Sequence, residues 1–454
     1  MSANPPALAR SLVAGDESTL NHARHVNYWR RCLKTYLPSA YTSNDSNRMT
    51  FGFFIISALD LLGDLQKATT ADEREAYAQW IYHCQHPEGG FRAFPATDFG
   101  ELRNEENKIW DPAHVPATFF ALLTLLLLGD SLERVRKRGC LVWLTKMQRP
   151  DGSFGETLGE NGRVEGGNDA RFGYCGTGIR YILRGTVEGP VDGVPDINVD
   201  KLVNCIRMSE TYDGGVSEAR FHEAHAGFTY CAINALSFLE RLPLGVASPP
   251  AASLRQDDRI RGLSNLNLTL HWLASRQTAT LDDEDAFDTN EDETDSSTTC
   301  HDTHSFVKFS SFPSKAGEIS YKGQPTSHFE IQWTGMNGRC NKIADTCYAF
   351  WVCGSLCTLN QLNIIDRIAL RRYLLDKAQH LVGGFGKLPG DPPDLYHSYL
   401  GLATMAMLNE QGLKSFHAAL CFSNEAAQHL ETLDWRRKIL GNRNADHSVV
   451  AKRA

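Results

Sequence analysis

Apolar residues recur along this chain at the spacing of one helix face, and each such stretch follows a short glycine-aromatic loop. In the stretch 227–242 the apolar side chains that share one stripe are Phe228, Cys231, Ala235, Leu236, Leu239 and Leu242. A stripe of this kind has to be buried against another element. We find no run that alternates apolar and polar residues with a period of two. The pattern therefore predicts helices rather than a sheet core.

The loop and the helix form a unit that repeats. The glycine-containing loops lie at 86–91 (HPEGGF), 148–154 (QRPDGSF), 212–216 (YDGGV) and 383–386 (GGFG), with a weaker copy at 335–338 (GMNG). The helices expected after them are 116–128, 172–183, 227–242, 346–359 and 398–408, and helices expected between them are 72–83, 132–147 and 367–380. One hairpin cannot bury both faces of its inner helix, so hairpins must stack, and about six would close into a ring. The sequence predicts an all-α fold, an α/α toroid of about six hairpins.

One long stretch departs from the repeat. We expect a surface insertion at about 276–327, because nine of the fourteen residues from Asp282 to Asp295 are acidic and carry little apolar surface. The segment is either disordered or an acidic docking segment. The toroid is expected at 45–440, after an N-terminal helical segment at 1–44 and before a flexible tail at 441–454.

Composition narrows the class of protein. The net charge of -8 gives no excess of Lys and Arg, so we expect no nucleic-acid partner. The longest apolar stretch, Ala117 to Leu128, is shorter than the ~20 residues that cross a bilayer, so we expect no transmembrane segment. The N-terminus has no secretory pattern. Several of the twelve cysteines fall within helical patterns, which favours reduced thiols in a cytoplasmic protein.

Three side chains suggest a metal site: Asp345, Cys347 and His397. Each lies where a repeat loop leads into an inner helix, and stacked repeats would bring these helix starts to one rim. Asp, Cys and His together suit zinc, with a fourth position open for a substrate thiolate. The alternative is that Asp345 is a helix cap and that Cys347 and His397 are core residues. Residues two apart on a helix point away from each other, so Asp345 must precede the helix to share an ion with Cys347.

A second group of side chains could bind an anion. Its members lie in or beside the repeat loops: His225, Arg339, Lys342, Tyr348 and Lys387. Helix N-termini at the same rim would add a favourable dipole, so a diphosphate fits there. The alternative is that Arg339 and Lys342 are solvated surface cations.

These motifs resemble the β subunits of protein prenyltransferases across about residues 45–410. The segment 338–351 (GRCNKIADTCYAFW) is similar to the zinc and diphosphate segment of that family, and 223–230 and 395–399 resemble two further signatures. The resemblance implies an obligate heterodimer with a helical-repeat α subunit. It also implies Zn²⁺ bound by Asp345, Cys347 and His397, with Lys387 beside the catalytic centre.

The resemblance also assigns substrate contacts. The diphosphate would be held by His225, Arg339, Lys342 and Tyr348, with Trp351 against the isoprenoid and Arg171 near the carboxylate end of the peptide. The full set of implied substrate-binding residues is His225, Gly227, Arg339, Lys342, Tyr348, Trp351, Thr50, Phe54, Arg171, Tyr174 and Leu400.

Three positions point to geranylgeranyltransferase type I within this family. Thr50 stands where farnesyltransferases carry a bulky Trp, and Leu400 replaces a Tyr on the same wall, so the lipid pocket is longer. Lys387 stands where magnesium-using members place an Asp, so Mg²⁺ should not be required. Tyr396 looks more like the farnesyltransferase residue beside the last position of the peptide.

The implied reaction transfers a geranylgeranyl group from geranylgeranyl diphosphate to the cysteine of C-terminal Cys-a-a-X tails, with X mainly Leu, on small GTPases of the Rho or Rap kind. A farnesyltransferase β subunit is the nearest alternative, and a Rab-type geranylgeranyltransferase is a weaker one. A terpene cyclase-like toroid and a non-catalytic helical scaffold are more distant. No Asp-x-Asp-Asp motif falls in an inner repeat, which argues against the cyclase.

Overall fold

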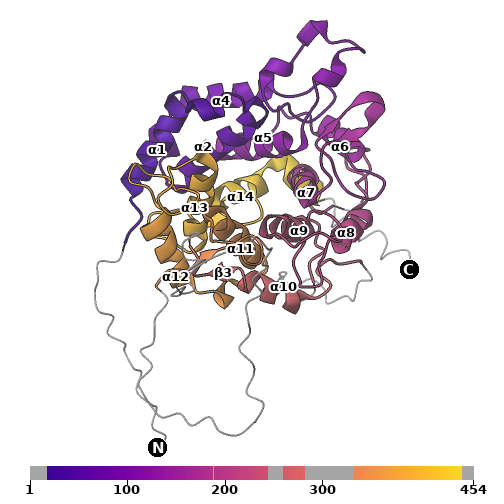
Figure 1. Ribbon diagram of the computed structural model, residues 1–454. Coiled ribbons are helices and arrows are strands. Elements are labelled where there is room, and N and C mark those ends of the chain that lie inside the picture. The colour runs from indigo at the N-terminus through magenta and orange to yellow at the C-terminus, as the bar shows by residue number, and fades with distance from the viewer. Residues whose placement is uncertain (1–17, 188, 244–258, 282–331, 442–454) are drawn as a thin grey trace, which may run out of the picture.

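Six helices form a closed inner ring. The computed structural model describes residues 18–187, 189–243, 259–281 and 332–441. The inner helices are α2 (Arg48–Leu61), α5 (Val115–Leu127), α7 (Ala170–Arg184), α9 (Ala226–Phe238), α11 (Thr346–Thr358) and α13 (Leu395–Met407). Each packs on the next in this order, and α13 packs on α2. The predicted α/α toroid is therefore confirmed (Figure 1).

The inner helices are apolar nearly all round, as expected for helices covered on both sides. In α5, eleven of thirteen residues are buried. Pro116 at its first turn costs no hydrogen bond there, and the His114 side chain caps the helix by accepting from the backbone N–H of Ala117. An Ala- and Leu-rich sequence then continues the helix without interruption. Of the six inner helices, α2 was not among the predicted helices, because no Gly-aromatic loop precedes it.

A second layer of helices covers the ring from outside. It contains α4 (Ala71–His83), α6 (Lys137–Lys146), α8 (Val199–Met208), α10 (Leu266–Ala274) and α12 (Arg367–Arg372), and α12 continues as the π-helical segment η8 (Tyr373–Ala378). The helices expected at 72–83 and 367–380 are present, whereas α6 starts five residues later than the expected 132. Helices α8 and α10 were not predicted. The short helix α3 (Leu65–Ala68) links α2 to α4.

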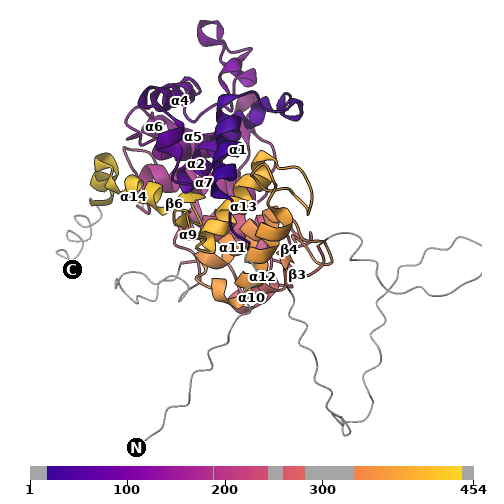
Figure 2. The ribbon, with the colours of Figure 1, turned by 90° about the vertical axis from the view of Figure 1, so that its left-hand side faces the viewer.

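The repeat loops press directly onto the outer helices. A Cβ atom on Gly89 would lie 2.2 Å from the carbonyl oxygen of Gly139 in α6, and one on Gly383 would lie 2.2 Å from that of Arg24. Both glycines also have positive φ, so no other residue fits without strain. Arg24 belongs to α1 (His22–Lys34), which therefore serves as the outer partner of the last repeat loop. Figure 2 shows α1 beside α2 and above α13.

Short antiparallel strand pairs lie in the loops between the helices. β1 (Thr157–Leu158) pairs with β2 (Val164–Glu165), and β3 (Gln277–Thr278) pairs with β4 (Gly335–Met336). The expected insertion at 276–327 therefore starts too early, because residues 276–281 belong to the fold and β3 joins the loop before α11. The remaining residues of that insertion, from 282 to 327, lie outside the described residues, as does most of the tail expected at 441–454.

A hairpin near the C-terminus closes one end of the ring; we call residues 416–423 the plug. It comprises β5 (Phe416–His417) and β6 (Phe422–Ser423), and helix α14 (Asn424–Thr432) follows it. Its turn accepts hydrogen bonds from tyrosine hydroxyls of three inner helices: Tyr174 to Ala419 O at 2.7 Å, Tyr230 to Ala418 O at 2.6 Å, and Tyr399 to Cys421 O. The plug was not predicted, because these contacts join residues up to 245 positions apart.

Within the described ranges, no helix is both long and apolar enough to cross a membrane.

Candidate functional site

The N-terminus of α11 carries two of the three predicted metal ligands. Asp345 is the N-cap residue, with extended backbone angles, and its Oδ1 accepts from the backbone N–H of Cys347 at 2.8 Å. Asp345 thus precedes the helix, as it must for both side chains to face one point. The next residue, Thr346, is held by two hydrogen bonds to the repeat loop that precedes α13. Its N–H donates to Lys387 O at 3.0 Å and its hydroxyl donates to Gly386 O at 2.7 Å.

His397 reaches the same point from the first turn of α13. Asp394 caps this helix and accepts from the backbone N–H of His397 at 2.9 Å. The other carboxylate oxygen of Asp394 lies 2.6 Å from Nδ1 of His397. This contact fixes the ring so that Nε2 faces Asp345, whose Oδ1 lies 3.4 Å away.

The three side chains form one compact cluster, which we call the ligand cluster. One ligand atom from each of Asp345, Cys347 and His397 lies within 4.8 Å of the other two. Among the described residues this is the one group of its kind. Oxygen, sulfur and nitrogen donors at this spacing suit Zn²⁺, and three protein ligands leave a fourth position open. The Asp394–His397 contact is the outer hydrogen bond that metal-bound histidines usually make.

The surroundings of the ligand cluster favour the protonated forms of Cys347 and His397. Burial raises the pKa of the Cys347 thiol well above its usual range, and the Asp345 carboxylate raises it further. Burial lowers the pKa of His397, but its hydrogen bonds to Asp345 and Asp394 outweigh that effect and raise the pKa to about 9. A bound divalent cation would therefore have to displace protons from both ligands.

Next to the ligand cluster, α9 and α11 bring His225 and Tyr348 together. His225 caps α9: its Nδ1 accepts from the N–H of Gly227 at 3.0 Å, and its Nε2 lies 3.2 Å from the Tyr348 hydroxyl. Burial lowers the pKa of His225, and nearby arginines lower it further. Gly338 allows this approach, since a Cβ there would lie 2.1 Å from the Tyr348 ring. Two of the residues expected to bind the diphosphate therefore lie side by side.

The three predicted cations lie in the loops around the start of α11. Arg339, Lys342 and Lys387 are all exposed. Arg339 lies 3.5 Å from Glu223, a weak pair between two half-exposed side chains. Lys387 is joined to α11 through its backbone carbonyl. The loops thus place positive charge beside the positive end of the α11 dipole, which favours an anion.

Two further predicted residues lie on α7. Arg171 is 60% exposed, pairs with Asp169 at 2.8 Å and lies over the ring of Phe228 at 5.5 Å. Its guanidinium therefore reaches toward the α9 side of the rim. Tyr174 is buried, and its hydroxyl is engaged by the plug rather than exposed at the rim. Sequence reasoning had no signal for that partner.

Aromatic side chains from all six inner helices follow one another around the interior; we call them the aromatic belt. Neighbouring ring pairs in it lie between 5.0 and 6.3 Å apart, for example Trp351 with Tyr230 at 5.0 Å and Phe54 with Tyr399 at 5.0 Å. The belt consists of Phe53, Phe54, Phe119, Phe120, Tyr174, Tyr230, Phe350, Trp351, Tyr396 and Tyr399. Thr50 lies one helical turn before Phe54, and Leu400 is buried beside Tyr399 on α13. The interior of the ring is therefore rich in apolar aromatic surface.

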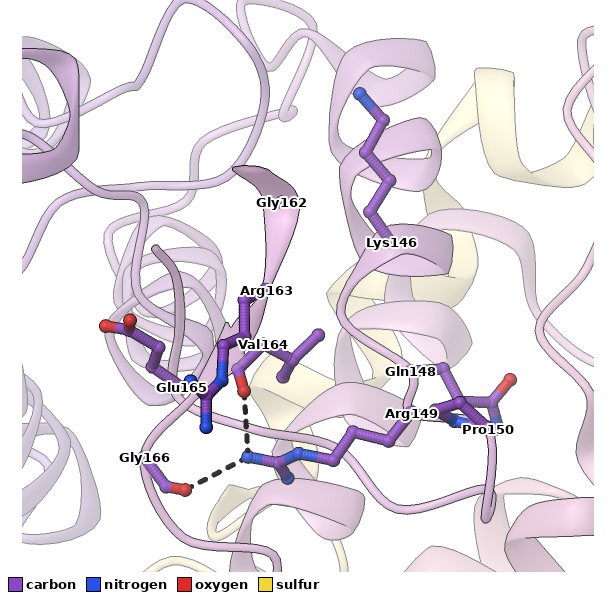
Figure 3. A pocket seen from close by; sticks show the side chains of 9 residues that line it. All are labelled: Lys146, Gln148, Arg149, Pro150, Gly162, Arg163, Val164, Glu165 and Gly166. Carbon is purple, nitrogen blue, oxygen red and sulfur yellow. Dashed lines mark hydrogen bonds between the residues drawn. The ribbon is translucent and has the colours of Figure 1, made fainter. Parts of the chain in front are cut away.

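A surface pocket elsewhere does not belong to this site. It has a volume of about 830 Å³ and lies between the end of α6 and the β1–β2 hairpin (Figure 3). Arg149 spans it by donating to the carbonyl oxygens of Val164 at 3.4 Å and Gly166 at 3.0 Å. Its arginine therefore holds the hairpin in place, and no residue of the ligand cluster lines it.

Known proteins share this architecture. The family described as "Prenyltransferase alpha-alpha toroid domain" matches residues 20–422. "Geranylgeranyl transferase type-1 subunit beta" of Arabidopsis thaliana is 27% identical over 406 residues, which cover 86% of this chain and 85% of that protein. The protein of the same name from Dictyostelium discoideum is 26% identical, with coverage of 93% and 99%.

Two further similarities bear on the site. "Protein farnesyltransferase subunit beta" of Schizosaccharomyces pombe is 24% identical, with coverage of 87% and 81%. Among solved structures, "Candida albicans protein geranylgeranyltransferase-I complexed with GGPP" superimposes with a TM-score of 0.69 at 26% identity and covers 91% of this chain and 99% of that one. The family match spans most of the chain and includes every helix of the ring. The chain therefore belongs to the prenyltransferase α/α toroid family.

Proposed function

We propose that this chain is the catalytic β subunit of a protein geranylgeranyltransferase type I. The observation that carries the proposal is the ligand cluster of Asp345, Cys347 and His397, next to the His225–Tyr348 pair at the start of α11. Two relatives named as geranylgeranyltransferase type-1 β subunits and a solved geranylgeranyltransferase-I support it.

In this proposal the ligand cluster holds one Zn²⁺. Bound there, Zn²⁺ would supply the positive charge that lets a substrate cysteine react as its thiolate near neutral pH. Asp394 orients His397, and the N-cap position of Asp345 directs its carboxylate to the same point as the Cys347 sulfur.

The anion group stabilises the leaving diphosphate. The thiolate attacks C1 of geranylgeranyl diphosphate, the C–O bond to the diphosphate breaks, and a thioether remains on the substrate. His225 and Tyr348 provide donors, while Arg339 and Lys342 contribute charge beside the α11 N-terminus. Donors fixed before the reaction stabilise developing charge without reorganisation. Lys387 adds a cation from the adjoining loop, so Mg²⁺ is not required.

The aromatic belt receives the isoprenoid. Thr50 leaves space where a larger residue would shorten the lining, and Leu400 keeps that wall apolar. Trp351 lies against the lipid, and Arg171 at the α7 rim meets the carboxylate of the Cys-a-a-X tail. The substrates are C-terminal tails of Rho- or Rap-type small GTPases, and the enzyme is a cytoplasmic heterodimer with a prenyltransferase α subunit.

Lipid competition tests the proposal. The heterodimer, purified with its α subunit, is offered farnesyl and geranylgeranyl diphosphates together with a Cys-a-a-Leu peptide, with zinc present and Mg²⁺ omitted. We expect geranylgeranyl transfer to dominate. Thr50→Trp should shift the preference toward farnesyl by about tenfold or more, since the added ring fills the space of an isoprene unit. Thr50→Val, a matched control of similar size, should keep the wild-type preference.

A farnesyltransferase β subunit is the second candidate, because Tyr396 resembles the farnesyltransferase residue and farnesyltransferase β relatives match the chain at 24% identity. Farnesyl transfer that dominates and requires Mg²⁺ would favour this candidate and overturn the roles of Thr50 and Lys387. Elemental analysis without zinc in the purified heterodimer would contradict both candidates.

A further inference from the structure

Cys340 occupies an unusual position in the turn that leads into α11. It follows Arg339 and precedes Asn341, whose φ of 56° lies in the left-handed region and turns the chain sharply. Of the eleven cysteines in the described part of the chain, Cys340 is the one that is exposed, and the others are buried or partly buried. A reagent in solution can therefore reach this sulfur first.

A buried arginine donates to the same sulfur. Nη2 of Arg276 lies 3.3 Å from Sγ of Cys340, although Arg276 itself is only 4% exposed. Its guanidinium lies over the ring of Trp272 at 4.7 Å. Its other hydrogen bonds go to the Trp272 carbonyl and to the Ser275 hydroxyl, and Nη1 has no hydrogen-bond partner among the described residues.

This contact places a guanidinium beside the exposed sulfur of Cys340. Within the described part of the chain, the hydrogen-bond partners of Arg276 are a carbonyl, a hydroxyl and a thiol, and none of the three carries a formal negative charge. A buried cation without a counter-charge is costly. In disulfide exchange the attacking sulfur carries negative charge, and a guanidinium that already donates to this sulfur stabilises that charge. The backbone bond from Asn337 N to Arg276 O at 2.9 Å and the β3–β4 pairing hold the two segments together.

We propose that Cys340 is a redox-modification site that exchanges with glutathione disulfide. The Cys340 thiolate attacks one sulfur of the disulfide, a bond forms between Sγ and that sulfur, and the original S–S bond breaks. The second glutathione leaves as a thiolate and takes a proton from water. Cys340 is thereby oxidised and the departing glutathione reduced, so no further oxidant is needed.

The adduct would regulate the transferase. Glutathione brings two carboxylates and one ammonium group, so a net negative charge is placed in the turn that carries Arg339 and Lys342. It would compete with the diphosphate for these cations and repel it. This consequence rests on the proposed function, whereas formation of the adduct does not.

The test uses the zinc-loaded heterodimer incubated with glutathione disulfide and analysed by peptide mass mapping. We expect an adduct on Cys340 and a loss of transfer of about tenfold, the effect of losing one charged contact of about 1.4 kcal/mol. Dithiothreitol should restore activity. Cys340→Ser should keep its activity during the same treatment. Cys205→Ser, which removes a partly exposed thiol on α8, should behave as wild type. Cys300 lies outside the described residues, and the peptide map separates its adducts from those of Cys340.

Several results would overturn the inference. One is a map without an adduct on Cys340, and another is a loss of transfer that persists in Cys340→Ser. An adduct that leaves both transfer and geranylgeranyl diphosphate binding unchanged would remove the regulatory role. Because mapping needs no activity, a heterodimer inactive from the start would refute the proposed function without affecting the test of the adduct. Arg276→Gln should slow adduct formation, while Arg276→Lys should slow it less.

Discussion

The starts of α7 and α11 are built alike but carry different chemistry. Each begins with an aspartate N-cap in extended conformation that accepts from the backbone N–H two residues later, in Asp169–Arg171 and in Asp345–Cys347. In α7 both carboxylate oxygens are used by the Arg171 guanidinium, at 2.8 and 2.9 Å. In α11 the side chain two residues later is a thiol, so the carboxylate is left to face His397.

This difference shows how the repeat divides its tasks. The loop, the cap and the inner helix recur because they build the ring, and they put the side chain two residues after the cap at the rim in both helices. In the proposed function, the identity of that side chain decides whether the rim position binds a metal, as at Cys347, or an anionic substrate end, as at Arg171. We call the start of α7, with Asp169 and Arg171, the α7 sector, and the start of α11, with Asp345 and Cys347, the α11 sector. A substitution in one sector should leave the function of the other nearly unchanged.

The largest effect should follow from removing the thiol of the α11 sector. Cys347→Ala should lower transfer by more than about 100-fold, because even outer-shell changes at metal sites cost about 10–100-fold. Zinc content should fall in parallel by elemental analysis. The control is Cys353→Ala, a buried thiol on the same helix outside the ligand cluster, which should keep its zinc. Wild-type zinc content in Cys347→Ala would contradict the assignment of metal binding to the α11 sector.

A smaller loss should follow from changing the residue behind the histidine. Asp394→Asn should weaken metal affinity about 10–100-fold, because the amide orients His397 less firmly and gives it less negative charge. Asn is also a good N-cap, so thermal unfolding should change little. Asp169→Asn makes the same substitution at the α7 cap and should leave metal affinity unchanged. Equal effects in a chelator competition would mean that Asp394 acts on the fold alone.

The pH dependence of metal binding should separate the sectors further. His397 has a pKa of about 9 in the metal-free chain, and the Cys347 thiol has a still higher one. Below these values each bound metal displaces protons, so the apparent affinity should fall as pH falls, by up to about tenfold per pH unit for each proton. Chelator competition between about pH 6 and pH 9 measures this slope. A flat profile would contradict the assignment of both ligands.

The smallest effect should come from the α7 sector. Arg171→Ala should raise the KM for the peptide about fivefold, the value of one exposed charge pair of about 1 kcal/mol, and should leave kcat and zinc content unchanged. A peptide with an amidated C-terminus should show no difference between Arg171→Ala and the wild type. A fall in kcat without a change in KM would place Arg171 in the chemistry instead.

The ring was predictable from local patterns, and the ligand cluster followed from stacking the predicted repeats, which brings the starts of α11 and α13 to one rim. Helical periodicity in 346–359 and 398–408 gave the inner helices, and the Asp345 cap fixed which way two ligands point. The role of Asp394 was not predicted, although an N-cap aspartate commonly accepts from the backbone N–H three residues later, which here is that of His397. The plug and the tyrosine contacts of Tyr174, Tyr230 and Tyr399 could not be read from the sequence, because they depend on how the ring closes. Helix α10 and strand β3 were not predicted, because they lie directly before the acidic stretch and no repeat loop marks them. The insertion was for this reason expected to start at about 276, before β3 ends.

The seating of α1 against the last repeat loop has a consequence for biogenesis. Gln379 accepts from Asn21 N at 3.0 Å and lies 3.0 Å from His25, so the join links residues more than 350 positions apart. A nascent polypeptide cannot make this join until the ribosome has synthesised the final hairpin. Until then α1 can pack on α2 but lacks its contacts with the last repeat loop, and contacts of such long sequence separation form slowly. Chaperone binding to α1 during translation would therefore suit a protein in which α1 meets the segment around Gln379 late in folding.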